Sequence, residues 1–184
     1  MTGFTLHLMR HGAPELTGRM LGRTDCDVTD AGIAACVANA TGLNAKCLIA
    51  SDLRRARRCA DAIGTPVVDA RWRELDFGDW DGLAAAEIDA DALGRFWQDP
   101  DHHAPPGGER WSALVERVGA AIAALVPQPT LVVTHGGAMR AALAHLCGMS
   151  HLQAWAFDLP CASVLTFELW AGTPRRGQIR GLRA

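Results

Sequence analysis

The chain has 184 residues, of which 49% are hydrophobic and 21% are charged, the composition of a soluble globular protein. A chain of this length is most simply one domain that buries about 70% of the surface its unfolded form exposes. The formal net charge of -2 gives no reason to expect nucleic acid or an acidic membrane as a partner.

The six cysteines lie mostly within apolar segments and form no Cys-x-x-Cys pair. A metal site or a disulfide framework normally shows tighter spacing, so we expect buried free thiols. Free thiols are typical of a reducing compartment, and the apolar run near the first residue is too short for a signal peptide. The sequence therefore predicts a cytoplasmic location.

Strand-like and helix-like patterns alternate along the chain. Residues 4–9 predict a short buried strand that leads directly into Arg10, His11 and Gly12. A polar loop follows, and residues 29–30 are suitable caps for a helix. The buried face of that helix is predicted from three apolar residues: Ile33, Val37 and Ala40.

The later elements follow the same alternation. The pattern predicts a strand over 46–50, a helix capped by Ser51 and Asp52 that reaches Ile63, and a short strand at 67–68. An amphipathic helix begins at Glu109 and is stopped by Pro127. After it we expect a buried strand over 130–134, a helix over 138–146, and strands over 163–169 and 178–182.

This order predicts an α/β fold, a three-layer sandwich with a mostly parallel central sheet flanked by helices. Residues 77–108 are the exception, because they are rich in Gly, Pro, Asp and Trp. We expect a single domain over 1–184, in which 77–108 is an insertion that lies as a lid over the carboxyl ends of the strands.

Two histidines occupy equivalent places in this pattern. His11 follows the first strand and His135 follows the strand over 130–134, and each is followed at once by glycine. Neighbouring parallel strands would bring both imidazoles to the edge of the sheet where α/β proteins bind ligands. Arg54 and Arg55 open a helix at the same edge, and arginines at a helix N-terminus favour an anion site.

Four motifs in this order resemble those of the histidine phosphatase superfamily, the phosphoglycerate-mutase-like enzymes. They are Arg10-His11-Gly12, the segment from Ser51 to Ala56, the segment from Glu74 to Gly82, and the segment from Thr134 to Gly137. The resemblance covers nearly the whole chain and implies the phosphoglycerate-mutase-like fold.

The resemblance also implies a role for each motif residue. His11 would be the phosphorylated nucleophile, and Glu74 the acid that protonates the leaving oxygen. Arg10, Arg55 and His135 would bind the phosphate, with His135 also among the catalytic groups. Such proteins require no metal, and no cofactor is expected, since two guanidiniums and a second imidazole can neutralise the phosphate oxygens.

The surrounding cations should lower the pKa of His11 and keep its imidazole neutral for attack. By resemblance, the carbonyl of Gly12 would fix one ring nitrogen as a donor and leave the other free. The identity of the acid is less constrained, because other carboxylates lie close to Glu74 in the sequence: Asp76, Asp79 and Asp81.

Within the superfamily, Gly22-Arg23-Thr24-Asp25 and the segment from Val28 to Gly32 are similar to a loop of the α-ribazole phosphatases of cobalamin biosynthesis. That similarity makes α-ribazole 5′-phosphate the leading substrate candidate. Ala13 and Pro14 replace the acidic-hydroxyl pair that usually follows Arg-His-Gly. This departure affects the mouth of the pocket, and hence the substrate, more than the catalytic core.

Several further residues have a possible functional role and an ordinary structural role as alternatives. Arg19, Arg23 and Gly136 are candidates for the substrate rim, although flexible surface arginines are an equal alternative. The other arginines of the 54–58 cluster are expected to be solvated or salt-bridged, and Glu109 to begin a helix. The tryptophans are expected mainly in the core, with two candidates for stacking on an aromatic substrate: Trp80 and Trp97.

The sequence thus predicts a metal-independent phosphomonoesterase that hydrolyses a small phosphorylated metabolite through a phosphohistidine. Alternatives are a sugar-phosphate phosphatase, a phosphohistidine-protein phosphatase and a phosphoglycerate mutase, the last disfavoured by the compact length. A catalytically silent phospholigand binder is an alternative of another class, but a binder has no need of the acid Glu74. The expected partner is a small phosphate monoester, with neither nucleic acid nor membrane, and a homodimer is compatible with the sequence.

Overall fold

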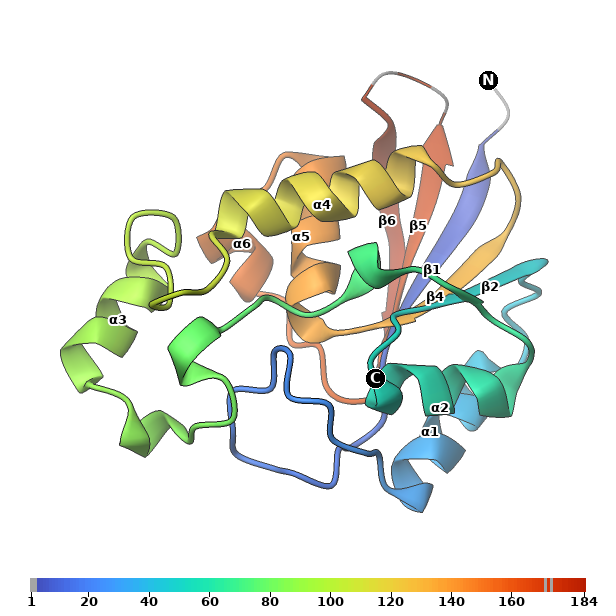
Figure 1. The fold of residues 1–184 in the computed structure, drawn as a ribbon. Helices are drawn as coiled ribbons and strands as arrows, with labels where there is room; N and C mark the ends of the chain where they lie inside the picture. Colours follow the sequence, from blue (N-terminus) through green and yellow to red (C-terminus); the bar gives the residue numbers. More distant parts are fainter. Residues whose placement is uncertain (1–2, 171, 173) are drawn as a thin grey trace.

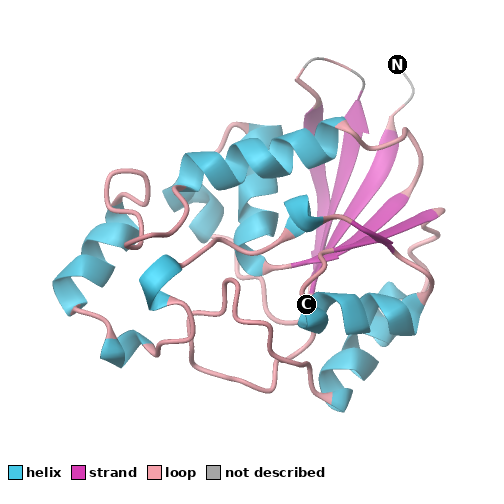
Figure 2. Cartoon of the chain, viewed as in Figure 1, coloured by secondary structure: helices cyan, strands magenta, loops and turns pink. Residues whose placement is uncertain are grey.

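The computed structural model describes residues 3–170, 172 and 174–184 and contains a six-stranded sheet with helices on both faces (Figures 1 and 2). The strand order is β3-β2-β4-β1-β5-β6; the first four strands pair in parallel, and β5 runs antiparallel to both of its neighbours, β1 and β6. This arrangement confirms the predicted α/β fold. The strands are β1 (Phe4–Arg10), β2 (Cys47–Ala50), β3 (Val67–Val68), β4 (Thr130–Thr134), β5 (Val164–Trp170) and β6 (Arg176–Arg183).

Two hydrophobic cores fill the space between the sheet and its helices. Successive strand residues point to opposite faces, so Val132 joins the larger core, while Val133 joins the smaller one. The larger core lies under α4 (Trp111–Ala123), α5 (Gly136–Cys147) and α6 (His151–Trp155). The smaller core lies under α1 (Asp30–Ala40) and α2 (Arg54–Ile63), on the other side of the sheet in Figure 1.

Helix α1 has the predicted cap and two of the three residues of its predicted buried face. Thr29 accepts a hydrogen bond from Gly32 N at 3.0 Å, as expected for the first residue before a helix. Ile33 and Ala40 are partly buried and pack against the smaller core as expected, whereas Val37 is 39% exposed, so the prediction is wrong for Val37 alone. The fully buried residues of the helix are Gly32 and Cys36. Gly32 is buried because the backbone of Gly12 approaches it closely, so that a Cβ at Gly12 would collide with the backbone of Gly32.

Helix α2 begins later than expected, at Arg54, and its cap position is occupied by Leu53 without a side-chain hydrogen bond. The two residues predicted as caps have other partners. Ser51 forms a hydrogen bond with His135, and Asp52 pairs with Arg73. The polar residues after β2 therefore connect the sheet to the region around His135 instead of capping the helix.

The segment 77–108 contains two short 3-10 helices, η2 (Gly78–Trp80) and η3 (Ala85–Glu87), followed by α3 (Ala90–Gln98). A further turn, η1 (Ala70–Trp72), precedes it. Figure 1 shows α3 at one end of the molecule, away from the sheet. Trp80 and Phe96 are buried and form an edge-to-face pair with ring centroids 5.7 Å apart, which anchors the segment to the larger core. That the segment acts as a lid stays a prediction.

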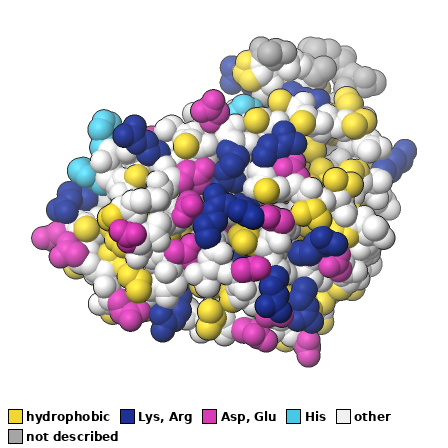
Figure 3. Space-filling model, in the orientation of Figure 1, with side chains coloured by type: hydrophobic (Ala, Val, Ile, Leu, Met, Phe, Trp, Pro, Cys, Tyr) yellow, Lys and Arg dark blue, Asp and Glu magenta, His cyan; other side chains and the backbone are white. Residues whose placement is uncertain are grey.

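The surface in Figure 3 carries basic and acidic side chains interspersed with hydrophobic ones. Most of the arginine cluster in α2 has carboxylate partners: Arg54 and Arg58 both pair with Asp27 at 2.7 Å, and Arg57 pairs with Asp61 at 2.9 Å. The prediction of salt bridges for these three residues is confirmed. In the described ranges, no helix is long and apolar enough to cross a membrane.

Candidate active site

The two histidines are placed by neighbouring parallel strands. β1 pairs with β4 so that Arg10 lies opposite Thr134, and His11 N donates to Thr134 O at 2.9 Å. The next residue on each strand is therefore a histidine, and the rings of His11 and His135 have centroids 5.1 Å apart at an angle of 61°. The predicted meeting of the two imidazoles at one edge of the sheet is confirmed.

The hydrogen bonding of His11 fixes which ring nitrogen carries the proton. Nδ1 lies 2.7 Å from the carbonyl oxygen of Gly12, which only accepts hydrogen bonds. Nδ1 is therefore the donor, and Nε2 keeps its lone pair. Burial, with the charge of Arg55 as the next cause and Arg10 as a smaller one, lowers the pKa of His11 to about 3. The imidazole is thus neutral at physiological pH.

His135 is fully buried, and its Nε2 shares a hydrogen bond of 2.9 Å with Ser51 Oγ. Its Nδ1 has no hydrogen-bond partner within the described part of the chain. Burial and the neighbouring charge of Arg55 hold the pKa of His135 well below its ordinary value of 6.5. Ser51 was not predicted as a site residue, although it opens the second of the four motifs.

Arg10 and Arg55 approach the two imidazoles from different elements. Arg10 Nη1 donates to Leu159 O at 2.6 Å, and Arg55 donates through both terminal nitrogens to loop carbonyls at 2.8 to 3.0 Å. Arg55 therefore also anchors the loop that contains Leu21, Gly22 and Thr24. The Nε atoms of both arginines are buried and, like His135 Nδ1, lack a partner among the described residues. Three such nitrogens around His11 are suited to bind the oxygens of one anion.

Glu74 is held at the N-terminus of α5. One carboxylate oxygen accepts from Leu75 N at 2.8 Å, and the other accepts from Gly137 N at 3.1 Å. A side chain at position 137 would collide with Glu74, so the glycine is required for this approach. The positive end of the helix dipole lies at the same point and favours a carboxylate there. The carboxyl group thus faces the helix that follows His135.

We expect Gly137→Ala to displace Glu74 and lower kcat for an alkyl phosphate by at least about 10-fold, if Glu74 is the acid. Thermal unfolding of the same variant, measured alongside, separates a displaced Glu74 from a loss of folding. Gly94→Ala is the matched control, because a Cβ at Gly94 in α3 meets no atom within 4 Å. Unchanged kcat in the Gly137 variant would contradict the required approach.

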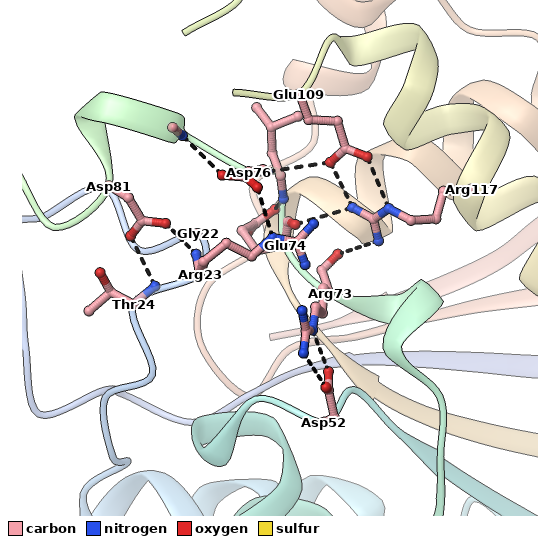
Figure 4. Close-up of polar contacts among 12 residues, drawn as sticks. Gly22, Arg23, Thr24, Asp52, Arg73, Glu74, Asp76, Asp81, Glu109 and Arg117 are labelled. Atoms are coloured by element: carbon pink, nitrogen blue, oxygen red, sulfur yellow. Dashed lines mark hydrogen bonds and ion pairs between the residues drawn. The ribbon is translucent and has the colours of Figure 1, made fainter. Parts of the chain in front are cut away.

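The backbone that carries Glu74 is held by a partly buried ion pair, as Figure 4 shows. Arg117 in α4 donates to Arg73 O at 3.1 Å and to Glu74 O at 3.2 Å, and it pairs with Glu109 at 2.8 Å. Glu109 also accepts from Asp76 N at 3.3 Å. Glu109 precedes α4 by two residues, so its predicted role as the start of that helix is wrong.

Two adjoining cavities open beside these groups. The larger, of about 300 Å³, is lined by Arg10, His11 and Glu74 together with Phe77 and the 14–21 loop. The smaller, of about 130 Å³, shares Arg10, Glu74 and Phe77 with it. Both cavities therefore meet at the predicted acid and one phosphate-binding arginine.

The remaining predicted site residues lie at the rim of the two cavities, in their walls, or in the protein interior behind them. Arg19 lines the larger cavity and donates to Gly82 O at 2.7 Å, while Gly136 lines the smaller one. Arg23 lines neither cavity and pairs with Asp76 at 3.1 Å (Figure 4). Arg55 and His135 lie behind the walls, fully buried. Their roles stay predictions.

Arg140 also lines the smaller cavity and was not predicted from the sequence. It lies four residues after Gly136 in α5, a spacing that places both on one face of the helix. That spacing is the signal in the sequence that would have identified it.

The buried neutral histidines make stability depend on pH. An unfolded histidine takes up a proton below pH 6.5, whereas His11 takes it up only near pH 3. The unfolded state therefore binds more protons between these values, and stability is lost as the pH falls through them. We expect the free energy of unfolding to fall by about 2 kcal/mol for His11 between pH 7 and pH 5. The lowered pKa of His135 acts in the same direction. Urea unfolding at both pH values measures this. His11→Asn should remove the first contribution, and an unchanged pH dependence in that variant would contradict the neutral burial.

At one edge of the mostly parallel sheet, two imidazoles, two guanidiniums and a carboxyl group come together near the two adjoining cavities. This arrangement defines an α/β enzyme suited to an anionic substrate. A family model for the histidine phosphatase superfamily (branch 1) matches residues 6–179. The chain belongs to this superfamily and is a phosphatase.

Three individual proteins illustrate the similarity. A glucosyl-3-phosphoglycerate phosphatase of Mycolicibacterium vanbaalenii is 36% identical over 167 residues, covering 78% of this chain and 74% of that protein. The native structure of a mycobacterial glucosyl-3-phosphoglycerate phosphatase matches with a TM-score of 0.86 at 28% identity, covering 97% of this chain and 98% of that one. An adenosylcobalamin/alpha-ribazole phosphatase of Escherichia coli K12 is 29% identical over 179 residues, covering 87% of this chain and 88% of that protein.

Proposed function

We propose that the protein is a phosphomonoesterase that forms a phosphohistidine on His11. The observation that carries this proposal is the neutral imidazole, whose Nδ1 donates to Gly12 O at 2.7 Å and whose Nε2 lone pair is therefore available. A nucleophile needs such a lone pair at the pH where the enzyme works. A catalytically silent binder would not need one.

In the first step, Nε2 of His11 attacks phosphorus and the bond from phosphorus to the ester oxygen breaks. The carboxyl proton of Glu74 passes to that oxygen, and the alcohol leaves. In the second step, the Glu74 carboxylate accepts a proton from a water molecule, whose oxygen attacks phosphorus as the bond to Nε2 breaks. Arg10, Arg55 and His135 stabilise the charge on the phosphoryl oxygens in both steps.

For the substrate, we place glucosyl-3-phosphoglycerate before α-ribazole 5′-phosphate. The support is the relative strength of the two similarities, 36% identity to a phosphatase of the first compound against 29% to a phosphatase of the second. Both compounds are small phosphate monoesters, so the catalytic residues themselves do not discriminate between them. The discriminating contacts must lie in the two cavities.

The test is phosphate release from a panel that contains both compounds, 2- and 3-phosphoglycerate and a phosphohistidine peptide, in excess chelator. We expect the highest kcat/KM for glucosyl-3-phosphoglycerate and full activity without metal. A higher value for α-ribazole 5′-phosphate would reverse the order of the two substrates. Interconversion of the phosphoglycerates without phosphate release would indicate a mutase, and no turnover of any compound would indicate a binder.

A further inference from the structure

The smaller cavity has a lining that the hydrolytic chemistry does not require. Three tryptophans from three different helices meet there, namely Trp97 of α3, Trp111 of α4 and Trp155 of α6. The ring of Trp155 lies with its centroid 5.4 Å from that of Trp97 and 5.3 Å from that of Trp111. We call this cavity, together with Arg140, the tryptophan compartment.

Arg140 is the cationic group of the tryptophan compartment that the proposed mechanism leaves without a role. Its guanidinium lies 5.3 Å from the ring centroid of Trp155, a cation–π contact, and Nη2 donates to Phe157 O at 3.1 Å. Its Nε is buried and has no partner in the residues the structure describes. Burial lowers the pKa of Arg140, while the nearby Glu74 carboxylate opposes that shift. A half-buried guanidinium that lines a cavity and has a free donor is suited to bind a carboxylate.

The position of Arg140 relative to Arg10 sets the spacing of the anions that the site accepts. A Cβ at Gly136 would lie 3.1 Å from Arg140 Nη1 and 3.6 Å from Arg10 Nε, so both guanidiniums flank the same glycine. Arg10 also lines the larger cavity beside His11, where the phosphoryl group must lie for attack. A second anionic group of the same small molecule, a few bonds from the phosphate, therefore meets Arg140.

We propose that Arg140 and the tryptophan compartment bind the carboxylate of a phosphorylated hydroxy acid, and that Arg140 thereby determines substrate specificity. The inference rests on the proposed phosphatase function and narrows its substrate class. A compartment of about 130 Å³ is smaller than the sites that hold whole drug-sized ligands, so it accommodates a fragment such as a glycerate carboxyl end. Any larger group on the hydroxy acid extends along the larger cavity, and the tryptophans exclude water from the ion pair.

The test compares 3-phosphoglycerate with glycerol 3-phosphate, in which a hydroxymethyl group replaces the carboxylate on the same three-carbon phosphate. Binding is measured by calorimetry on the His11→Ala protein with and without Arg140→Gln, so the result does not depend on turnover. We expect Arg140→Gln to weaken binding of 3-phosphoglycerate by about 10- to 100-fold, the worth of a charged hydrogen bond, and binding of glycerol 3-phosphate by less than about 3-fold. Arg140→Lys should give an intermediate loss of affinity for 3-phosphoglycerate, because lysine keeps the positive charge but lacks the paired N–H donors of a guanidinium.

Arg95→Gln is the matched control, since Arg95 is an exposed arginine of the neighbouring α3 and should change neither affinity. Equal losses for the two ligands, or no loss for 3-phosphoglycerate, would overturn the role of Arg140. If the Arg140→Gln protein does not fold, Arg140→Lys provides the test. An unchanged preference of the lysine variant for 3-phosphoglycerate over glycerol 3-phosphate would also overturn the proposal. Failure of the phosphatase function would appear separately, as absent phosphate release by the unmodified enzyme in the presence of normal ligand binding.

Discussion

Replacing His11 by alanine is expected to lower kcat for phosphate release by at least about 10⁴-fold, because the substitution removes the atom that forms the covalent intermediate. Arg10, Arg55 and His135 remain in that variant and can still bind the phosphate. KM should therefore change far less than kcat. Steady-state phosphate release from the best substrate of the panel measures both quantities.

A second measurement tests the intermediate itself. Wild-type enzyme quenched during turnover of a ³²P-labelled substrate should carry an acid-labile phosphoryl group, and the His11→Ala protein should carry none. His102→Ala is the control for loss of a histidine, since that side chain is 81% exposed in a turn far along the chain from the site. Retained phosphatase activity in His11→Ala would show that the proposed nucleophile is wrong.

The imidazole pair was predictable from the sequence because its geometry follows from a local rule. Each histidine is the first residue after a buried strand, and parallel neighbours end at the same edge of a sheet. Strand register then fixes the rest, since Arg10 opposite Thr134 leaves His11 and His135 adjacent. No long-range information beyond the pairing of two strands is needed.

The surroundings of Glu74 depend on contacts that have no such local rule. Arg117 holds the backbone of Glu74 from a helix 43 residues away, and Glu109 completes the clamp from the end of the 77–108 segment. Sequence periodicity describes which face of α4 is apolar, but not which backbone carbonyls Arg117 reaches. For the same reason, the burial of Gly32 was missed, because close backbone approach leaves no apolar pattern.

Arg55 shows how a correctly located residue can have more than the expected function. The sequence places it at the start of α2 near the site, where a phosphate contact is the simple prediction. In the structure its two terminal nitrogens hold the loop that contains Leu21, Gly22 and Thr24, and only Nε lacks a partner among the described residues. Backbone carbonyls as arginine partners cannot be read from side-chain types, so this second function was not predictable.

Replacing Glu74 by glutamine is expected to lower kcat by about 10²- to 10⁴-fold for an alkyl phosphate, the usual worth of a general acid. An alkoxide is a poor leaving group, so its departure requires the proton. The p-nitrophenolate of p-nitrophenyl phosphate leaves without one, and we expect its hydrolysis to fall by less than about 10-fold. Glutamine keeps a side-chain oxygen that can accept from Leu75 N or Gly137 N, which preserves the shape of the site.

The loss of kcat for the alkyl phosphate, divided by the loss for p-nitrophenyl phosphate, identifies the acid among four neighbouring carboxylates. Asp79→Asn is the matched control, because Asp79 is exposed and lines neither cavity, and it should leave both rates unchanged. Asp76 and Asp81 already have partners, since Asp76 pairs with Arg23, and Asp81 accepts from the backbone of Thr24 at 3.0 Å. Only Glu74 lies where the two cavities join. Equal losses for both substrates in Glu74→Gln would mean that this carboxyl positions the phosphate and does not protonate the leaving oxygen.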